Sequence, residues 1–222
     1  MLKIERTVLP SPEQWDIIIE GMRNPMNSWD KSDSYATHIE DPETLNTADF
    51  EFFLGDADHD LMMRLANGGS THAKYRRMIP VYITVNAPLY WWKEMSTYSV
   101  GVVTNSCSTM HKIHAKQFVI EDFSCEHLDH SDLELINETI MVLNNNRFYF
   151  LRTKEKKFWW HMIQLLPTSY NQKRTVMLNY EVLTNIYHTR KNHKLDEWHT
   201  FCDWIESLPH SDLITGDTEV AE

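Results

Sequence analysis

The sequence predicts an α+β protein in which a small antiparallel sheet packs with helices and the C-terminal half is rich in helix. Two features support this class. Residues 79–85, Ile-Pro-Val-Tyr-Ile-Thr-Val, form a β-branched and aromatic run typical of a strand. From residue 131 onward, apolar residues recur mostly at helical spacing. We expect a single domain over residues 1–214 and a frayed acidic tail at 215–222.

Local signals predict two helices before that strand. A serine in the N-cap position and a proline in the first helical position predict a helix over 12–23. The polar but aromatic segment 24–34 is expected to be an ordered loop, while residues 35–46 carry no clear signal. A second helix is predicted to begin near residue 56 and to stop at Gly68-Gly69.

Turn residues and periodicity predict the elements after the strand. Ala87-Pro88 follows the strand as a turn and begins an aromatic-rich helix through Met95. Residues 100–103 are apolar but interrupted by glycine, and Asn105 to Thr109 are expected to form a polar loop. A short strand is possible at 117–120. Helices are then predicted from Ser131 to Leu143 and over 148–165, 173–190 and 195–207.

Composition excludes several functional classes. Lys and Arg number 21 against 32 Asp and Glu, a net charge of −11, so no long nucleic acid is expected as a partner. A single nucleotide needs only a few local cations and N–H groups. No apolar stretch approaches the roughly 20 residues of a membrane helix and no signal-peptide pattern is present, so we expect a soluble, cytoplasmic protein without a membrane partner. Three cysteines are interpreted as reduced and structural: Cys107, Cys125 and Cys202.

Motifs for common chemistries are largely absent. The sequence has no glycine-rich phosphate loop and no nucleophile elbow. His111 with His114, and His127 with His130, form two His-x-x-His pairs that could assemble a zinc site with nearby cysteines or could be solvated surface pairs. We favour the solvated interpretation and predict no metal.

Two adjacent tryptophan pairs stand out, Trp91-Trp92 and Trp159-Trp160. At helical positions, one ring of each pair should face a core. The neighbouring ring could stack on a planar heterocycle or fill a subunit interface.

Two segments resemble the flavin-dependent thymidylate synthases, known as ThyX, and the likeness spans about residues 70–205. In that family a strand, a small-residue–Pro turn and a helix lead to a Ser-x-Asn-x-x-Ser-x-Arg loop. Here Asn105 and Ser108 match its Asn and second Ser. Residues 179–190 are similar to the family's Asn-x-Arg-x-Leu-x-Asn-Phe-x-x-x-Arg helix. The resemblance implies the ThyX-like α+β fold.

The likeness is incomplete where the family holds its flavin. The family's Arg-His-Arg triplet is replaced by Thr97-Tyr98-Ser99, or by the triplet one residue later, without a cation. The closing Arg of the loop, a phosphate contact in the family, is Met110 here. Lys112 could restore the charge, but an ammonium cannot reproduce the bidentate fork. The helix keeps its second Arg as Arg190, while its first is Glu181.

The resemblance implies roles for the matching residues. Arg190 would be catalytic, stabilising negative charge on the pyrimidine when C5 becomes a nucleophile. It could instead form an ordinary salt bridge with Glu181, Glu197 or a helix C-terminus. The polar loop could likewise be a plain turn, Asn185 a backbone cap, and the arginines solvated charges. Substrate-binding candidates are Asn105, Ser106, Ser108, Lys112, Asn185 and Arg190, and cofactor-binding candidates are His72, Arg76, Arg77 and Asn179.

The sequence therefore favours a divergent thymidylate synthase-like protein that binds dUMP. The resemblance implies C5 reductive methylation with methylenetetrahydrofolate, NADPH and FAD, no enzyme nucleophile, and a homotetramer with sites shared between subunits. Arg190 and the bend around Ser108 would together grip a pyrimidine phosphate. The alternative is a non-catalytic nucleotide-binding or assembly protein that keeps the fold without flavin chemistry.

Overall fold

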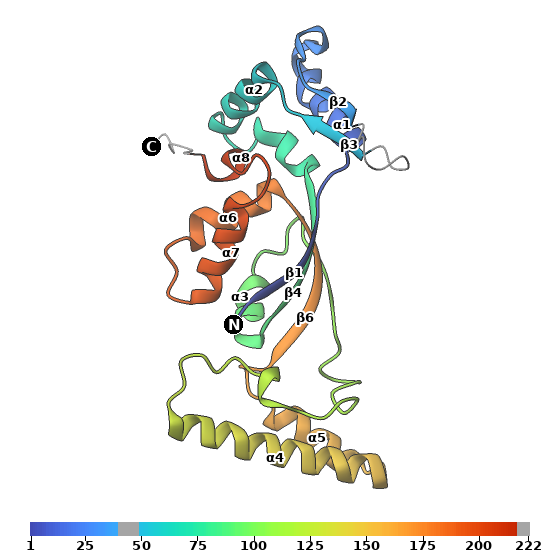
Figure 1. Cartoon of the computed structure of the whole chain (residues 1–222), viewed down its shortest axis with the longest axis vertical. Coiled ribbons are helices and arrows are strands. Elements are labelled where there is room, and N and C mark those ends of the chain that lie inside the picture. The colour runs from blue at the N-terminus through green and yellow to red at the C-terminus, as the bar shows by residue number, and fades with distance from the viewer. Residues whose placement is uncertain (40–48, 217–222) are drawn as a thin grey trace. The chain divides into compact units, whose positions relative to one another are not determined.

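The computed structural model describes residues 1–39 and 49–216 (Figure 1). It is a mixed α+β fold with helices dominating the C-terminal half, so the predicted class is confirmed. A four-stranded antiparallel sheet has the strand order β1–β4–β6–β5. A second, two-stranded sheet is antiparallel, with Tyr35 opposite Phe53. The strands are β1 (Lys3–Val8), β2 (Tyr35–Ile39), β3 (Asp49–Phe53), β4 (Pro80–Pro88), β5 (Val103–Ser106) and β6 (Asn171–Asn179).

Helices begin where the sequence supplies caps or turn residues. At the start of α1, the Gln14 N–H donates to Ser11 Oγ at 3.3 Å and the Ser11 N–H donates to Gln14 Oε1 at 2.8 Å. The α-helices are α1 (Pro12–Arg23), α2 (Asp56–Asn67), α3 (Leu89–Met95), α4 (His130–Thr153), α5 (Lys156–Leu165), α6 (Tyr180–Arg190), α7 (Asp196–Glu206) and α8 (Asp212–Thr215). Short 3-10 helices are η1 (Asn24–Met26), η2 (Trp29–Lys31), η3 (Ala73–Met78) and η4 (Ile120–Asp122).

Several sequence predictions are wrong. Ala87-Pro88, predicted as a turn that begins a helix, ends strand β4, and Pro88 is the N-cap of α3. The helix predicted over 173–190 begins only at Tyr180, because residues 171–179 are strand β6, with Val176 and Leu178 buried at a period of two. The helix predicted over 148–165 is divided by Lys154, whose φ of 59° is left-handed. Residues 117–120 contain no strand. The strand instead lies at β5, where a polar loop was predicted to start.

Among the described residues, the chain groups into two compact units. Unit 1 comprises residues 1–6, 83–99 and 104–176, and unit 2 comprises residues 7–82, 100–103 and those from 177 onward. The single domain over 1–214 stays a prediction. Thr215 ends helix α8, and the rest of the predicted tail beyond residue 216 lies outside the described residues.

Unit 1 is built around helices α4 and α5, which pack against each other (Figure 1). Trp91 and Trp92 are both buried, and Trp92 Nε1 donates to the Gln172 carbonyl oxygen at 2.8 Å. Trp159 packs against the core cluster, while Trp160 is 43% exposed. At least one ring of each tryptophan pair therefore faces a core, as predicted, but in the first pair both rings are buried, so only Trp160 has an exposed ring. The cluster is Ile113, Phe118, Phe123, Ile140, Leu143 and Met162.

Unit 2 contains helix α6, which carries the predicted site residues Asn185 and Arg190 and is capped by a third, Asn179. Helix α6 contacts η3, α7 and α8, and it buries Leu183 and Ile186 completely. Packing on several sides fixes the helix axis, so its exposed polar side chains have defined positions. In the part of the chain that the structure describes, no helix is long and apolar enough to cross a membrane.

Candidate functional site

Arg190 lies at the C-terminal end of α6, as expected from the sequence. Its guanidinium carbon is 4.8 Å from the ring centroid of Trp198 in α7. Trp198 is fully buried, so its ring face is a fixed platform, and a cation over an indole face is attracted by the ring quadrupole. The arrangement holds the guanidinium in place at the end of the helix.

Four predicted site residues gather in two adjoining hollows of unit 2. Cavity A has a volume of about 440 Å³ and contains Arg77, Asn179 and Asn185. Cavity B has a volume of about 360 Å³ and contains Arg76 and Asn185. The cavities share three residues: Ser70, Glu181 and Asn185.

In cavity A, the positions of the side chains follow from local structure. Asn179 is the N-cap of α6, and its Oδ1 accepts the Val182 N–H at 3.1 Å. Because Oδ1 is used for the cap, the Asn179 Nδ2 remains as a donor. Arg77 donates from Nη2 to the Ser70 carbonyl oxygen at 3.1 Å. Gly101 has a φ of 76°, and a Cβ there would lie 3.3 Å from Asn179 Nδ2.

The charges of the cavities differ from those expected of a simple anion pocket. Arg76 and Arg77 bring two guanidinium groups, and Glu181 brings a carboxylate to both cavities. The cavities can therefore bind a ligand that both accepts hydrogen bonds from cations and amides and offers a donor toward Glu181.

The Asn105–Lys112 segment lies in unit 1. Asn105 and Ser106 belong to β5, and all of its residues are exposed. The Ser108 Oγ accepts the N–H of His111 at 2.8 Å, so this hydroxyl closes a turn, as the plain-turn alternative requires. Ser108 also lines a cavity of about 410 Å³ that contains the ion-paired Lys173, whose Nζ is 2.6 Å from Glu5 Oε2. Lys112 is exposed.

The remaining predictions fall in different places. His72 precedes η3, and its ring lies 3.3 Å from the position that a Cβ on Gly68 would take. Arg190 belongs to unit 2 and Ser108 to unit 1, so their predicted approach stays a prediction.

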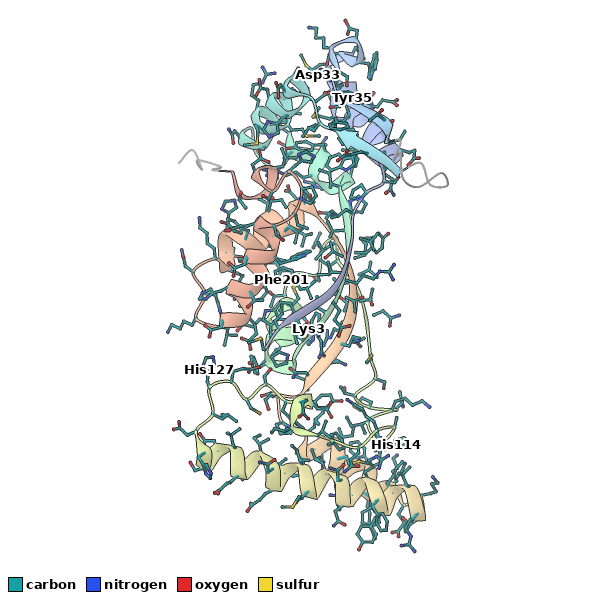
Figure 2. All side chains as sticks on the ribbon, in the orientation of Figure 1. Lys3, Asp33, Tyr35, His114, His127 and Phe201 are labelled. Carbon is teal, nitrogen blue, oxygen red and sulfur yellow. The ribbon has the colours of Figure 1, made fainter. Side chains whose placement is uncertain are left out.

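The two His-x-x-His pairs do not form one site. His114 and His127 lie near opposite ends of helix α4 (Figure 2). Burial and the charges of Lys112, Lys154 and Arg147 lower the pKa of His114. Across residues 1–39 and 49–216, no group of three or more His, Cys, Asp or Glu side chains is arranged to hold a metal ion.

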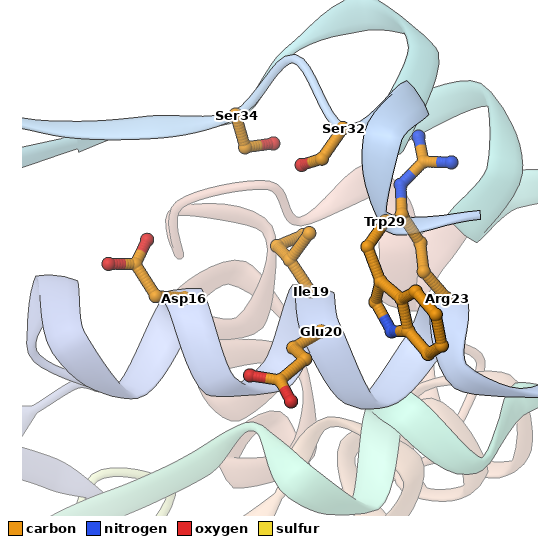
Figure 3. A pocket seen from close by; sticks show the side chains of 7 residues that line it. All are labelled: Asp16, Ile19, Glu20, Arg23, Trp29, Ser32 and Ser34. Carbon is orange, nitrogen blue, oxygen red and sulfur yellow. The ribbon is translucent and has the colours of Figure 1, made fainter. Parts of the chain in front are cut away.

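Another cavity, of about 160 Å³, lies between α1 and the 24–34 segment (Figure 3). Beside it, Arg23 Nε donates to Asp58 Oδ1 at 2.5 Å, and both side chains are buried. Asp58 Oδ2 accepts from Ser32 Oγ at 2.8 Å and from the N–H of Ser34 at 3.0 Å. Burial would raise the pKa of Asp58, but hydrogen bonds from Ser34, Ser32 and Arg23 outweigh it and lower that pKa.

The 24–34 segment also supplies a carboxylate that accepts hydrogen bonds from helix α2. The Asp33 carboxylate accepts the N–H groups of Ala57 at 2.9 Å and Asp58 at 3.0 Å, at the first turn of α2. Gly55 allows this approach, because a Cβ there would lie 2.2 Å from Asp33 Cγ. The segment is an ordered loop, as predicted, and these contacts give it a structural role.

Some residues of the cavities were not singled out in the sequence. Ser70 lines both cavities, and Gly101 lines cavity A. A glycine within the apolar run 100–103 was the available signal for Gly101, whereas nothing in Gly68-Gly69-Ser70 distinguishes Ser70 from a helix stop.

Comparisons with known proteins agree with this fold. No protein-family model matches the sequence, and no curated protein matches it. The crystal structure of ThyX from Helicobacter pylori complexed with FAD and dUMP is 17% identical, with a TM-score of 0.64 over 96% of this chain and 97% of that chain. A second structure of that protein, also with FAD and dUMP, gives 17% identity and a TM-score of 0.63 over 97% of each chain. The chain has the ThyX fold, as the sequence resemblance implied.

Proposed function

We propose that this chain is a divergent thymidylate synthase-like protein that binds dUMP and methylates it reductively at C5. The observation that supports this most is the ThyX fold over 96% of the chain. It is reinforced by Arg77, Asn179 and Asn185, which line one cavity beside the helix that carries Arg190.

The donor set of cavity A fits part of a flavin. Arg77, the Asn185 amide and Asn179 Nδ2 can donate to ring carbonyls and phosphate oxygens, and Gly101 leaves room for the Asn179 side chain. The cofactor contacts we propose are His72, Arg76, Arg77 and Asn179. FAD, when bound, supplies the redox chemistry, with NADPH and methylenetetrahydrofolate as co-substrates.

In this proposal the protein binds the substrate and stabilises charge. The Trp198 face orients the Arg190 guanidinium, which stabilises negative charge that develops on the pyrimidine as C5 becomes nucleophilic. Asn185 contacts the base. Asn105, Ser106, Ser108 and Lys112 supply donors to the nucleotide phosphate. No protein nucleophile is needed, and burial raises the pKa of the Cys202 thiol to about 11.

Replacing Arg190 by alanine should weaken dUMP binding by about 1–3 kcal/mol, the loss of a hydrogen bond to a charged group. Calorimetric titration of the purified protein with dUMP and FAD, separately and together, measures this. Arg64→Ala removes an exposed guanidinium of the same unit from helix α2 and is the matched control. Unchanged dUMP affinity in a folded Arg190→Ala protein would refute the role of Arg190.

A second candidate is a nucleotide-binding protein without flavin chemistry. Glu181 favours it, because its carboxylate lines both cavities and opposes the phosphates of a dinucleotide. The same titration separates the two. Bound flavin absorbance that NADPH reduces supports the enzyme. A colourless protein that binds dUMP but fails to bind FAD at micromolar concentration supports the second candidate.

We also propose that the chain forms a homotetramer. Leu135, Val142 and Tyr149 lie seven residues apart on one face of α4, and they are 63%, 45% and 42% exposed. Such an exposed row marks a contact surface for another protein chain. Light scattering should give four times the chain mass of 26.3 kDa, and a monomer at micromolar concentration would contradict the proposal.

A further inference from the structure

Arg76 is a buried cation without a visible counter-charge. Only 3% of it is exposed, and its Nε has no hydrogen-bond partner among the described residues. Within residues 1–39 and 49–216, no carboxylate forms an ion pair with its guanidinium. Arg76 belongs to η3, which contacts helices α1, α2 and α6, so the side chain is held inside unit 2.

An unpaired guanidinium in this position is costly. Buried charges are nearly always paired, because the interior solvates an ion poorly. Lysine or histidine could lose its proton under such conditions, but arginine stays charged at every relevant pH. The neighbouring phenol shares a side-chain hydrogen bond with Arg76 but does not neutralise it, because burial raises the pKa of Tyr75 to about 12. An anion that binds beside Arg76 would supply the missing negative charge.

Cavity B gives such a group access to Arg76. The cavity is about 360 Å³ and open to solvent, and it places Ser70 and Asn185 beside Arg76. The Thr184 hydroxyl is already used, since it donates to the Tyr180 carbonyl oxygen at 2.9 Å. Ser70 and Asn185 make no side-chain hydrogen bond to any described residue, so their hydroxyl and amide remain as donors.

One group in the cavity opposes an anion. Glu181 lines cavity B without forming an ion pair with Arg76 among the described residues. Its carboxylate must therefore weaken the binding of any anion at Arg76, and removing its charge should strengthen that binding. This gives the site a second, opposite test.

We propose that Arg76, Ser70 and Asn185 form a binding site for a phosphate group. One guanidinium, one hydroxyl and one amide supply donors of the kind that phosphate oxygens accept, in a partly enclosed place where charged hydrogen bonds are strong. The site extends the proposed function, in which Arg76 contacts the cofactor, a molecule that carries phosphate groups, while the dUMP phosphate is held elsewhere. It rests on that function only for the identity of the molecule, because free phosphate has the same chemistry.

The test measures thermal unfolding against inorganic phosphate at constant ionic strength, with chloride as the reference anion. Phosphate should raise the Tm of the wild-type protein, because an anion that binds only the folded state stabilises it. Arg76→Met should weaken phosphate binding at least about tenfold, and Glu181→Gln should strengthen it several-fold. Arg64→Met is the control, because it removes an exposed guanidinium of the same unit that lines neither cavity A nor cavity B.

A second readout separates binding from a purely structural role. Without phosphate, Arg76→Met should be as stable as wild type or more stable, since it removes an unpaired buried charge. A lower Tm for Arg76→Met together with an unchanged phosphate effect would overturn the site. If Arg76→Met does not fold, Glu181→Gln decides alone: no gain in phosphate affinity refutes the proposal.

Further outcomes of these experiments show whether the anion at Arg76 is free phosphate, a bound nucleotide or a carboxylate of a second copy of the chain. Phosphate protection without dUMP binding supports the site and contradicts the proposed function. Binding of dUMP by wild type and Arg76→Met with equal affinity, without any phosphate effect, contradicts the site and leaves the proposed function standing. If Arg76→Met instead lowers the oligomer mass and phosphate has no effect, a carboxylate of a second copy is the partner and the site is refuted.

Discussion

Replacement of Asp58 by alanine should lower the free energy of unfolding by about 3–5 kcal/mol, the typical cost of breaking a buried ion pair by removing one partner. Asp58 is fully buried and bonded to Arg23, whose side chain is also buried. The mutant leaves that guanidinium uncompensated. It also removes the acceptor of the Ser32 hydroxyl and the Ser34 N–H. Urea denaturation followed by circular dichroism measures the change.

Two variants assign the loss to charge or to hydrogen bonding. Asp58→Asn keeps an acceptor oxygen but removes the charge, so its loss should be smaller than that of Asp58→Ala. Adding Arg23→Met to Asp58→Asn should restore part of the stability, because the unpaired cation is gone. A loss below about 1 kcal/mol in Asp58→Ala, or no recovery in the double mutant, would contradict this account.

The same pair should appear in the acid limb of the stability profile. Because the folded-state pKa of Asp58 is lowered, its stabilisation is fully present above the unfolded-state pKa, near 4. It is lost as the pH falls through the lower, folded-state value. Wild-type stability should therefore decline more steeply below about pH 4 than that of Asp58→Asn.

Replacement of Trp198 by alanine should lower the free energy of unfolding by about 3–5 kcal/mol, as for other fully buried tryptophans. The ring has no exposed surface, and its centroid lies 6.0 Å from that of Phe201. Truncation leaves a cavity between α6 and α7 and removes the face under Arg190. Thermal and urea unfolding measure the loss, and the dUMP titration shows whether Arg190 still acts.

Trp198→Phe is the matched control because it keeps an aromatic face and most of the buried volume. It should cost clearly less stability than the alanine variant and should retain more of the dUMP affinity. Equal losses in the two variants would show that the indole packing is not what stabilises this part of unit 2.

The elements that could be predicted from sequence are those with local signals. Helix α1 begins with a capping box formed by Ser11 and Gln14, four neighbouring positions of chain that need no tertiary context. Strand β6 was missed because Val176 and Leu178 precede Leu183 and Ile186, and together they fit a helical period as well as a strand. Asn179, the N-cap of α6, is the one sequence signal that marks where the strand ends and the helix begins.

Strands β1 and β5 had no usable pattern. The residues of β5 are all exposed, and β1 has no buried residue, so neither strand shows the alternation that predicts a half-buried strand. The break between α4 and α5 occurs at Lys154. Because no glycine or proline lies there, the sequence contains no signal that predicts the break. These features depend on pairing and packing with distant residues.

Some residues of the candidate site could be predicted from the sequence and others could not. Asn179, Asn185 and Arg190 were found through a family motif, and their common helix kept them together. The burial of Arg76 could not be predicted, because an arginine beside another arginine is usually solvated. The importance of Asp58 was also hidden, since an acidic residue in a first helical turn has an ordinary explanation in the helix dipole.

The reciprocal hydrogen bonds of Asp33 and Asp58 determine how the 24–34 segment and the start of α2 unfold locally. Asp33 accepts N–H groups of the first turn of α2, while Asp58 accepts the N–H groups of Asp33 and Ser34. If either side detaches, the N–H donors of both sides lose their acceptors, and the buried Asp58 carboxylate loses the N–H groups of Asp33 and Ser34. The loop and the start of the helix are therefore expected to open in a single cooperative event, so that the amides on both sides show the same opening free energy in hydrogen exchange.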